Sequence, residues 1–397
     1  MERLRILGVD QLSLRTVERG KRSDSMANRE AIQKMRDFYA HKADAPMYME
    51  EFGYFTRERW TREGHITTET KMADLFGFDR GGKMEIGELG WCEAEFSPAF
   101  TQEVLEDRGN YELVRDSAGR HVLYFKGRRN GFMPEFVDHP VKNQATWERD
   151  VKWRLDPDTA SRHEGMDRRM QPFAQAGRAG AVICQGLIGG FMYLRSLIGP
   201  MELLYMVYDD PSLIHDCMQT WFALADRVIA EHQKCVTLDE LFLAEDICYK
   251  GGSLISPAMM REFLFPYYQQ LIENTKKRQA GRGRKLYLQI DTDGDCRPVI
   301  PVYGELGLDY MSPFEVASGC DVVALRKQYP GLLMRGGIDK RILARGKDAI
   351  DQELRRIIPF MRKQGGYIPV CDHGVPEEVA FEDYCHFRKR LYELGCV

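Results

Sequence analysis

The sequence predicts an α/β fold, a distorted (β/α)8 barrel of the TIM type that forms a single domain over residues 1–397. From residue 181 onward, short apolar runs alternate with amphipathic helices, and this alternation is typical of βαβ units built around a parallel sheet. Six or seven such units occur without a glycine-rich phosphate loop. The absence of that loop favours a closed barrel over an open, doubly wound sheet.

The second half of the chain shows the alternation most clearly. We expect strands at 181–185, 240–244, 286–290, 308–311, 332–334 and 366–370. We expect helices at 211–231, 257–277, 347–363 and 381–394. The helix at 347–363 has the strongest pattern, because its apolar residues recur at helical spacing on one face.

The first half is less regular. Residues 1–45 are expected to form an N-terminal helical extension with a helix at 29–41, and residues 45–52 a first strand. Residues from about 90 to 145 have the character of an insertion. It contains an expected hairpin over 111–127 that turns at Asp116–Gly119.

Composition and charge exclude several classes of protein. Apolar residues make up 44% of the chain, which excludes wholesale disorder. Lys and Arg number 56 against 60 Asp and Glu, so the charge of −4 gives no reason to expect nucleic acid or an anionic membrane as a partner. No stretch approaches 18 apolar residues, and the ten cysteines form no CxxC pair. We therefore expect a cytoplasmic protein with reduced thiols that acts on a small molecule; a homodimer is left open.

Catalytic groups in barrels of this kind follow the carboxyl ends of the strands. Five of the six expected strand ends carry carboxylates, namely Glu245 with Asp246, Asp291 with Asp293, Glu315, Asp339, and Asp372. Like charges crowded around one barrel mouth repel each other unless a cation or shared protons offset them. The sequence therefore predicts a metal site or an acid/base site at this end of the barrel.

Three of these positions have a specific interpretation as metal ligands. Asp291 and Asp293 are two residues apart, so in an extended segment their side chains point the same way and can converge on one ion. His373, beside Asp372 at a strand end, is expected to be a ligand or a general acid or base. The alternative is that such aspartates cap helices and shape turns, and we favour it for Asp295.

The remaining candidates divide into catalytic and substrate-binding residues. Glu315, Glu245 and Asp339 are the catalytic candidates, although Asp339 could instead cap the helix that follows it. The substrate-binding candidates are Arg195, Tyr193, Phe191 and Gln185. Arg195 could bind an anionic group or form a structural ion pair. His232 is expected on a surface or helix face.

Several motifs, taken in order, resemble the uroporphyrinogen decarboxylase superfamily over roughly residues 130–395. They are Phe191-Met-Tyr-Leu-Arg-Ser-Leu-Ile-Gly199, Glu245-Asp246, Asp291-Thr-Asp-Gly294, Pro313-Phe-Glu315, Gly336-Gly-Ile-Asp339 and Asp372-His-Gly-Val-Pro376. The resemblance implies a distorted (β/α)8 barrel with its active site in the mouth. The superfamily includes the haem-pathway decarboxylase and corrinoid-dependent methyltransferases, so membership alone does not fix the reaction.

Two departures from the family pattern bear on the reaction. The decarboxylase has an arginine-rich segment where this chain has Glu50 and Glu51, so decarboxylation of a porphyrinogen is not expected. The thiol methyltransferases of the superfamily hold zinc with a His-x-Cys pair and a further Cys. The matching positions here are Asp291, Asp293 and His373, and oxygen and imidazole ligands suit a metal that polarises an oxygen atom.

The resemblance thus implies a corrinoid-dependent methyltransferase of the O-demethylase type. It would move a methyl group from an O-methylated small molecule, such as an aromatic methyl ether, to cobalamin carried by a separate corrinoid protein. Zinc would be held by Asp291, Asp293 and His373, with Glu315 or Glu245 completing the shell or protonating the leaving oxygen. Aromatic side chains that could stack on the substrate are Phe52, Tyr54, Trp91, Phe191 and Tyr193. The alternatives are a lyase that uses the same carboxylates on a small organic acid, and a non-catalytic binding protein.

Overall fold

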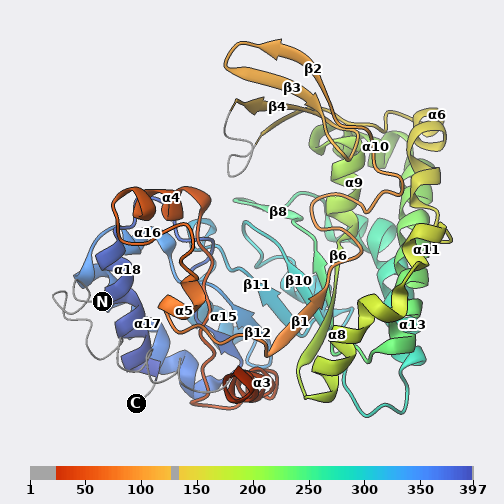
Figure 1. The fold of residues 1–397 in the computed structure, drawn as a ribbon. Helices are drawn as coiled ribbons and strands as arrows, with labels where there is room; N and C mark the ends of the chain where they lie inside the picture. Colours follow the sequence, from red (N-terminus) through yellow and green to blue (C-terminus); the bar gives the residue numbers. More distant parts are fainter. Residues whose placement is uncertain (1–23, 127–133, 396–397) are drawn as a thin grey trace. The chain divides into compact units, whose positions relative to one another are not determined.

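The computed structural model describes residues 24–126 and 134–395. The chain divides into two compact units. The first unit comprises Met1–Met84, Ala179–Val182 and Asp309–Val397, and the second comprises Glu85–Arg178 and Ile183–Leu308. In each unit parallel strands alternate with helices, as the α/β barrel class requires (Figure 1). The prediction that the whole chain forms one domain stays a prediction.

Three parallel strands form the sheet of the second unit. They are β6 (Val182–Ile188), β7 (Glu240–Ala244) and β10 (Tyr287–Asp291). Every residue of β6 and β7 is buried, as expected for parallel strands that are covered on both faces. Ala244 is in register with both Ile188 and Asp291, so the three strands end at the same level. Residues that follow these strands therefore meet at one edge of the sheet.

In the second unit helices follow each of these strands. The helices of this unit are α6 (Gln144–Thr146), α7 (Ala160–His163), α8 (Met166–Arg178), α9 (Gly190–Ile198), α10 (Pro200–Asp209), α11 (Pro211–Cys235), α12 (Pro257–Met259), α13 (Phe265–Arg278) and α14 (Ile300–Gly304). A π-helical turn at Met260–Leu264 joins α12 to α13, so the helix expected at 257–277 is one run with a widened turn. Helix α11 packs against α8 and α13.

The predicted insertion is an antiparallel sheet with the strand order β2-β3-β4-β5. Its strands are β2 (Glu103–Arg108), β3 (Tyr111–Arg115), β4 (His121–Phe125) and β5 (Glu135–Asp138). The hairpin expected at 111–127 is confirmed as β3 and β4, apart from Gly127, which lies outside the described residues. A second, small hairpin pairs β8 (Cys248–Tyr249) with β9 (Gly252–Ser253).

The first unit contains three further parallel strands, β11 (Tyr310–Ser312), β12 (Leu333–Arg335) and β13 (Tyr367–Ile368). Its helices are α3 (Asp24–Tyr39), α4 (Tyr54–Arg62), α5 (Met72–Leu75), α15 (Val322–Gln328), α16 (Lys340–Leu343), α17 (Lys347–Gln364) and α18 (Phe381–Gly395). Strand β1 (Lys83–Ile86) crosses the division between the units. Helix α17 packs against α18.

The expected first strand at 45–52 is wrong. This segment makes only an isolated parallel bridge, between Phe52 and Val375. Pro46 has no amide hydrogen to donate, and the amide of Tyr48 donates to the carboxylate of Asp79 at 2.9 Å instead of to a neighbouring strand. Among the helices of the described ranges, none is long and apolar enough to cross a membrane.

Candidate active site

The ends of β7 and β10 are tied together by backbone hydrogen bonds in the second unit. The amides of Glu245 and Asp246 both donate to the carbonyl oxygen of Asp291, at 2.9 and 3.1 Å. Asp246 has a φ of 42°, in the left-handed region that Asp tolerates better than most residues. This turn places three acidic residues at one edge of the sheet, as the sequence predicted.

Glu245 is fully buried and holds the start of α9. Its Oε1 accepts the Phe191 amide at 3.1 Å and its Oε2 accepts the Tyr268 hydroxyl at 2.6 Å. The same hydroxyl accepts the Gly190 amide at 2.5 Å. Burial raises the pKa of Glu245 to about 7, against the lowering effect of these hydrogen bonds. A Cβ at Gly189 would lie 2.1 Å from Oε2, so the carboxylate requires glycine there.

These contacts favour a positioning role for Glu245, because both of its oxygens are already engaged within the protein. Its predicted catalytic role stays a prediction. The sequence analysis did not identify Tyr268 as the partner of Glu245, because it lies 23 residues further along the chain.

Arg195 forms an ion pair with Asp246 at the same edge. Its Nη2 lies 2.6 Å from Oδ2 of Asp246, and each side chain keeps 26% of its surface exposed. Its Nη1 also donates to the Asp246 carbonyl at 3.3 Å. Of the two roles predicted for Arg195, the structure therefore shows the ion pair. The partial exposure leaves both side chains accessible from solvent.

The other predicted substrate-binding residues lie in the core of the second unit. Phe191 and Tyr193 are each 1% exposed and Gln185 is 0% exposed. The amide of Gln185 donates to the carbonyls of Ile86 and Gly186, at 3.0 and 2.9 Å. Its Oε1 lies 2.7 Å from Nδ1 of His232. This burial favours packing over substrate contact for all three predicted residues.

His232 was expected on a surface or helix face, and its exposure was predicted wrongly. The side chain is fully buried, with Nδ1 against Gln185 and Nε2 3.2 Å from Glu88. Glu88 also pairs with Arg169 at 2.8 Å. The hydrogen bond from His232, together with Arg169, lowers the pKa of Glu88 to about 2. This network, buried at Gln185 and His232 and partly exposed at Glu88 and Arg169, links β6 to α11 and α8.

The segment after β10 is held by the small β8–β9 hairpin. The Thr292 hydroxyl accepts the Cys248 amide at 3.0 Å and donates to the carbonyl of Asp293 at 3.1 Å. Asp295 donates its amide to the Tyr249 carbonyl at 2.9 Å, and its carboxylate binds the Arg297 guanidinium at 2.7 Å. Asp295 therefore shapes the turn, as expected. Asp291 is half-buried and Asp293 is exposed.

In the first unit, the predicted aspartates Asp339 and Asp372 both accept backbone amides. Asp339 caps α16, since it accepts the Arg341 amide at 2.9 Å and pairs with the Arg341 guanidinium at 2.8 Å. The structure thus shows the capping alternative, and the catalytic role of Asp339 stays a prediction. Asp372 accepts the amides of Val316 and Lys340 at 2.9 and 3.2 Å. It thereby joins the loops after β11 and β12, and burial raises its pKa.

His373 and Glu315 flank this aspartate. His373 directly follows Asp372 and is partly exposed. Glu315 accepts the Ser318 hydroxyl at 2.9 Å and precedes the 3-10 turn at Val316–Ser318. Both residues follow parallel strands of the first unit, which is the position that the sequence predicted for them.

A half-buried acid that sequence reasoning did not assign to the site is Glu50. Its two oxygens lie 3.3 and 3.2 Å from the Cys371 amide, which donates to them. Burial raises the pKa of Glu50 to about 7. The signal was present as two adjacent glutamates, Glu50 and Glu51, after the apolar run 45–49 and before the bridge at Phe52. Its neighbour Glu51 pairs with Arg335.

The predicted zinc ligands divide between the units, Asp291 and Asp293 in the second and His373 in the first. Their donor atoms, carboxylate oxygen and imidazole nitrogen, are chemically suited to zinc. Within residues 24–126 and 134–395, no group of three His, Cys, Asp or Glu side chains is gathered closely enough to hold a metal ion. The three-residue metal site therefore stays a prediction.

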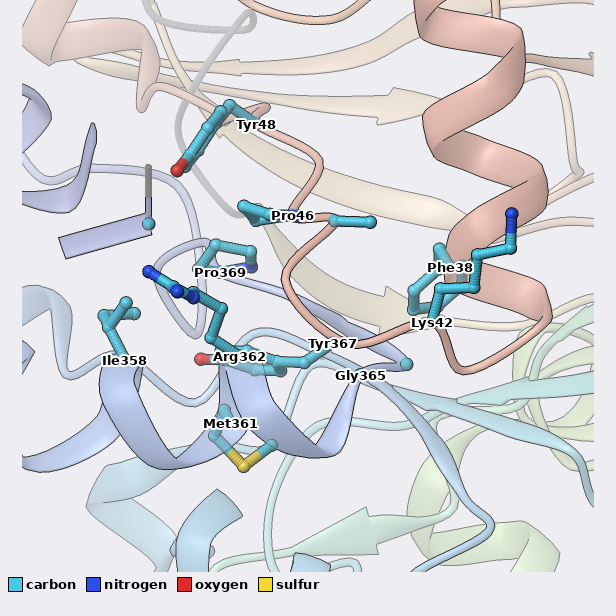
Figure 2. A pocket seen from close by; sticks show the side chains of 13 residues that line it. Phe38, Lys42, Pro46, Tyr48, Ile358, Met361, Arg362, Gly365, Tyr367 and Pro369 are labelled. Atoms are coloured by element: carbon cyan, nitrogen blue, oxygen red, sulfur yellow. The ribbon is translucent and has the colours of Figure 1, made fainter. Parts of the chain in front are cut away.

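A hollow in the first unit lies away from these residues. Figure 2 shows Phe38 and Lys42 from the end of α3 and its following loop, with Met361 and Arg362 of α17 on its other side. Gly365 and Gly366 line it and precede β13, so the hollow is at the amino end of that strand. Catalytic sites of barrels form at the carboxyl ends of the strands, so this hollow is not the candidate active site.

Comparison with known proteins identifies the family. The uroporphyrinogen decarboxylase (URO-D) family model matches residues 175–393, more than half of the chain. The chain therefore belongs to the uroporphyrinogen decarboxylase family, and the predicted resemblance to that superfamily is confirmed. This family's barrel agrees with the predicted fold class.

Individual relatives are more distant. A uroporphyrinogen decarboxylase from Saccharopolyspora erythraea is 25% identical over 191 residues, which cover 43% of this chain and 50% of that protein. The chain thus spans about half the length of this curated relative. A solved structure of a methyltransferase from Methanosarcina mazei matches with a TM-score of 0.47 and 14% identity, over 70% of this chain and 76% of that one. Similarity at this level does not indicate an activity.

Proposed function

We propose that this protein transfers a methyl group from an O-methylated small molecule, an aromatic methyl ether, to a corrinoid protein. The observation that carries the proposal is the pair Asp291 and Asp293 at the carboxyl end of β10. By the resemblance to the superfamily, these residues match the positions at which its thiol methyltransferases have sulfur and imidazole ligands. Oxygen ligands leave a metal more Lewis-acidic than thiolates do, which suits a departing oxygen rather than a thiol.

The metal is part of the proposal. Asp291, Asp293 and His373 would hold zinc, and zinc when bound would supply a Lewis acid for the leaving oxygen. Cobalamin on the corrinoid protein would accept the methyl group, because breaking a methyl–oxygen bond needs a very strong nucleophile.

The protein's own residues would position the substrate. Glu245 fixes the start of α9. Arg195, in the last turn of that helix, forms the ion pair with Asp246. Trp91 is 52% exposed, and its ring lies 5.3 Å from that of Phe242. A half-exposed indole supported from behind offers a flat surface on which an aromatic ring can stack. Glu315 is the candidate that would deliver a proton to the leaving oxygen.

The glutamates near residue 50 argue against porphyrinogen decarboxylation. Glu50 is desolvated against the Cys371 amide and Glu51 pairs with Arg335. Neither can attract the acetate and propionate groups of a porphyrinogen. A lyase acting on a small organic acid is the second candidate, favoured by the pKa of Glu50 near 7, which lets this carboxyl group give or take a proton around neutral pH.

Metal content and turnover of three variants test the metal proposal. His373→Ala and Asp291→Asn should each lose bound zinc and methyl transfer, because each removes a ligand. Asp295→Asn is the matched control, since it changes a carboxylate of the same loop that binds Arg297. Full zinc and full activity in His373→Ala would refute the metal assignment.

The acceptor distinguishes the two candidate functions. Purified protein is incubated with an aromatic methyl ether and cob(I)alamin, and methylcobalamin is followed by its absorbance. Formation of methylcobalamin supports the methyltransferase. Release of carbon dioxide from a small organic acid without any corrinoid would establish the lyase instead.

A further inference from the structure

Helix α10 of the second unit carries a ridge of exposed apolar side chains. Met201, Tyr205 and Tyr208 are 57%, 64% and 74% exposed. Their spacing of four and three residues places them on one face of the helix, and we call them the α10 ridge. Most exposed apolar residues occur singly, whereas a contiguous row of large ones marks an interaction site.

The opposite face of α10 accounts for its folding. Leu203 and Val207 are buried at 1% and 6% exposure, and they pack the helix against the unit. The ridge therefore contributes nothing evident to the core. Tyr and Met are enriched in the cores of protein interfaces, where a few such side chains carry most of the binding energy.

The charges on α10 indicate which kind of partner fits. The helix carries Glu202 in its first turn and Asp209 at its end, and between Pro200 and Asp209 it has no Lys or Arg. If two copies of α10 packed antiparallel across a two-fold axis, Glu202 would lie close to Asp209 of the copy; if they packed parallel, each acidic residue would lie close to its own counterpart. Like charges at such a contact disfavour self-association, so the ridge fits a different protein with an apolar patch and a basic rim.

The position of α10 connects the ridge with the candidate site. Helix α9 starts at Gly190, directly after β6, and its first amides bind the Glu245–Tyr268 pair. Helix α10 follows after the single turn at Gly199 and packs against α9. Figure 1 shows both helices beyond the end of β6. The ridge thus lies at the same end of this sheet as Asp246 and Asp291.

We propose that the α10 ridge is the docking surface for the corrinoid protein. This inference rests on the proposed function and adds the surface through which the methyl acceptor is recognised. The partner would bring an apolar patch bordered by Lys and Arg onto the ridge, and its cobalamin would approach the end of β6, β7 and β10.

Assays with two methyl acceptors distinguish a loss of docking from a loss of catalysis. The full-length variant Tyr205→Ser/Tyr208→Ser is compared with wild type, using first free cob(I)alamin and then the purified corrinoid protein that wild type methylates. Ser and Tyr have similar helix propensities, so α10 should stay folded. We expect an unchanged rate with free cob(I)alamin and a KM for the corrinoid protein at least about tenfold higher.

Two further variants sharpen the test. Tyr111→Ser, on β3 of the same unit, removes a tyrosine that is 43% exposed and should leave both rates unchanged. Glu202→Lys/Asp209→Lys should raise the KM for the corrinoid protein and reverse its dependence on salt, because it places positive charge opposite a basic rim.

Other results would refute either the proposed role of the α10 ridge or the proposed function. An unchanged KM for the corrinoid protein in Tyr205→Ser/Tyr208→Ser refutes the ridge alone. Sedimentation that shows a wild-type dimer and a monomeric ridge variant would make the ridge a self-association surface, and this too refutes the proposal. If wild type methylates neither acceptor, the proposed function fails and the corrinoid partner fails with it.

Discussion

The buried carboxyl group of Glu245 should make the protein less stable as the pH rises. Its pKa lies at 4.5 in an unfolded chain and at about 7 in the folded protein. The folded state therefore binds more protons than the unfolded state between these values, and stability falls as the pH rises through them. A shift of this size corresponds to about 3 kcal/mol over the whole range, of which about 2 kcal/mol falls between about pH 5.5 and pH 8.

The variant Glu245→Gln isolates this effect. Glutamine is nearly isosteric and does not titrate, so the contribution of residue 245 to the pH dependence should disappear. Urea unfolding of wild type and variant at about pH 5.5 and pH 8 measures it. Wild type should lose about 2 kcal/mol more than the variant between these two values.

The control for this measurement is Glu50→Gln. Glu50 also has a pKa raised to about 7 by burial, so it should contribute an independent loss of the same sign. An identical pH dependence in wild type and Glu245→Gln would show that Glu245 is not desolvated, and the reasoning from its burial would be wrong.

Two more predictions concern the carboxylates of Asp372 and Glu88. Asp372→Ala should destabilise the protein by about 2–4 kcal/mol, because it leaves two backbone amides without their acceptor; Asp372→Asn keeps an acceptor and should cost less, so equal losses in the two variants would contradict this account. Glu88, with a pKa near 2, should stabilise the fold above about pH 4.5 and lose that contribution as the pH falls toward 2. Since its side chain is about one-third exposed, we expect only about 1–2 kcal/mol. Acid unfolding of Glu88→Gln measures this contribution, and a transition at the same pH as wild type would argue against it.

Much of the fold could be predicted because it is encoded locally. The hairpin at 111–125 was found from Asp116–Gly119, and the structure gives the reason. The Asp116 carboxylate accepts the amides of Ala118 and Arg120 at 3.0 and 2.9 Å, and Gly119 adopts a φ of 80°. The segment at 45–52 does not form the expected strand because its backbone bonds to residues far along the chain, among them Asp79 and Val375, which no local pattern reveals.

The burial of His232 could be predicted from the helical spacing of α11. Trp221, Leu224 and Val228 define the buried face of α11, and His232 continues it four residues after Val228. The expected helix ended at 231, so the histidine fell outside the pattern. Its partners Gln185 and Glu88 lie on other elements of the second unit, so their contacts could not be derived from spacing.

The positions of the acidic residues at strand ends could be predicted, but their roles could not. The end of a strand determines where an acidic residue lies. Its role depends on which backbone amides and basic side chains bind its carboxylate. Asp339 and Asp372 bind amides within the first unit, and Asp246 pairs with Arg195 in the second.

These contacts provide the partners that the acidic residues at the strand ends need. Carboxylates crowded at strand ends can be stabilised without a cation or shared protons, since Asp246, Asp339 and Asp372 each have partners within their own unit. The negative charges of these three residues therefore do not require a metal. The metal proposal therefore depends on Asp291, Asp293 and His373 themselves, and loss of zinc from Asp291→Asn with retention in Asp295→Asn is the result that would sustain it.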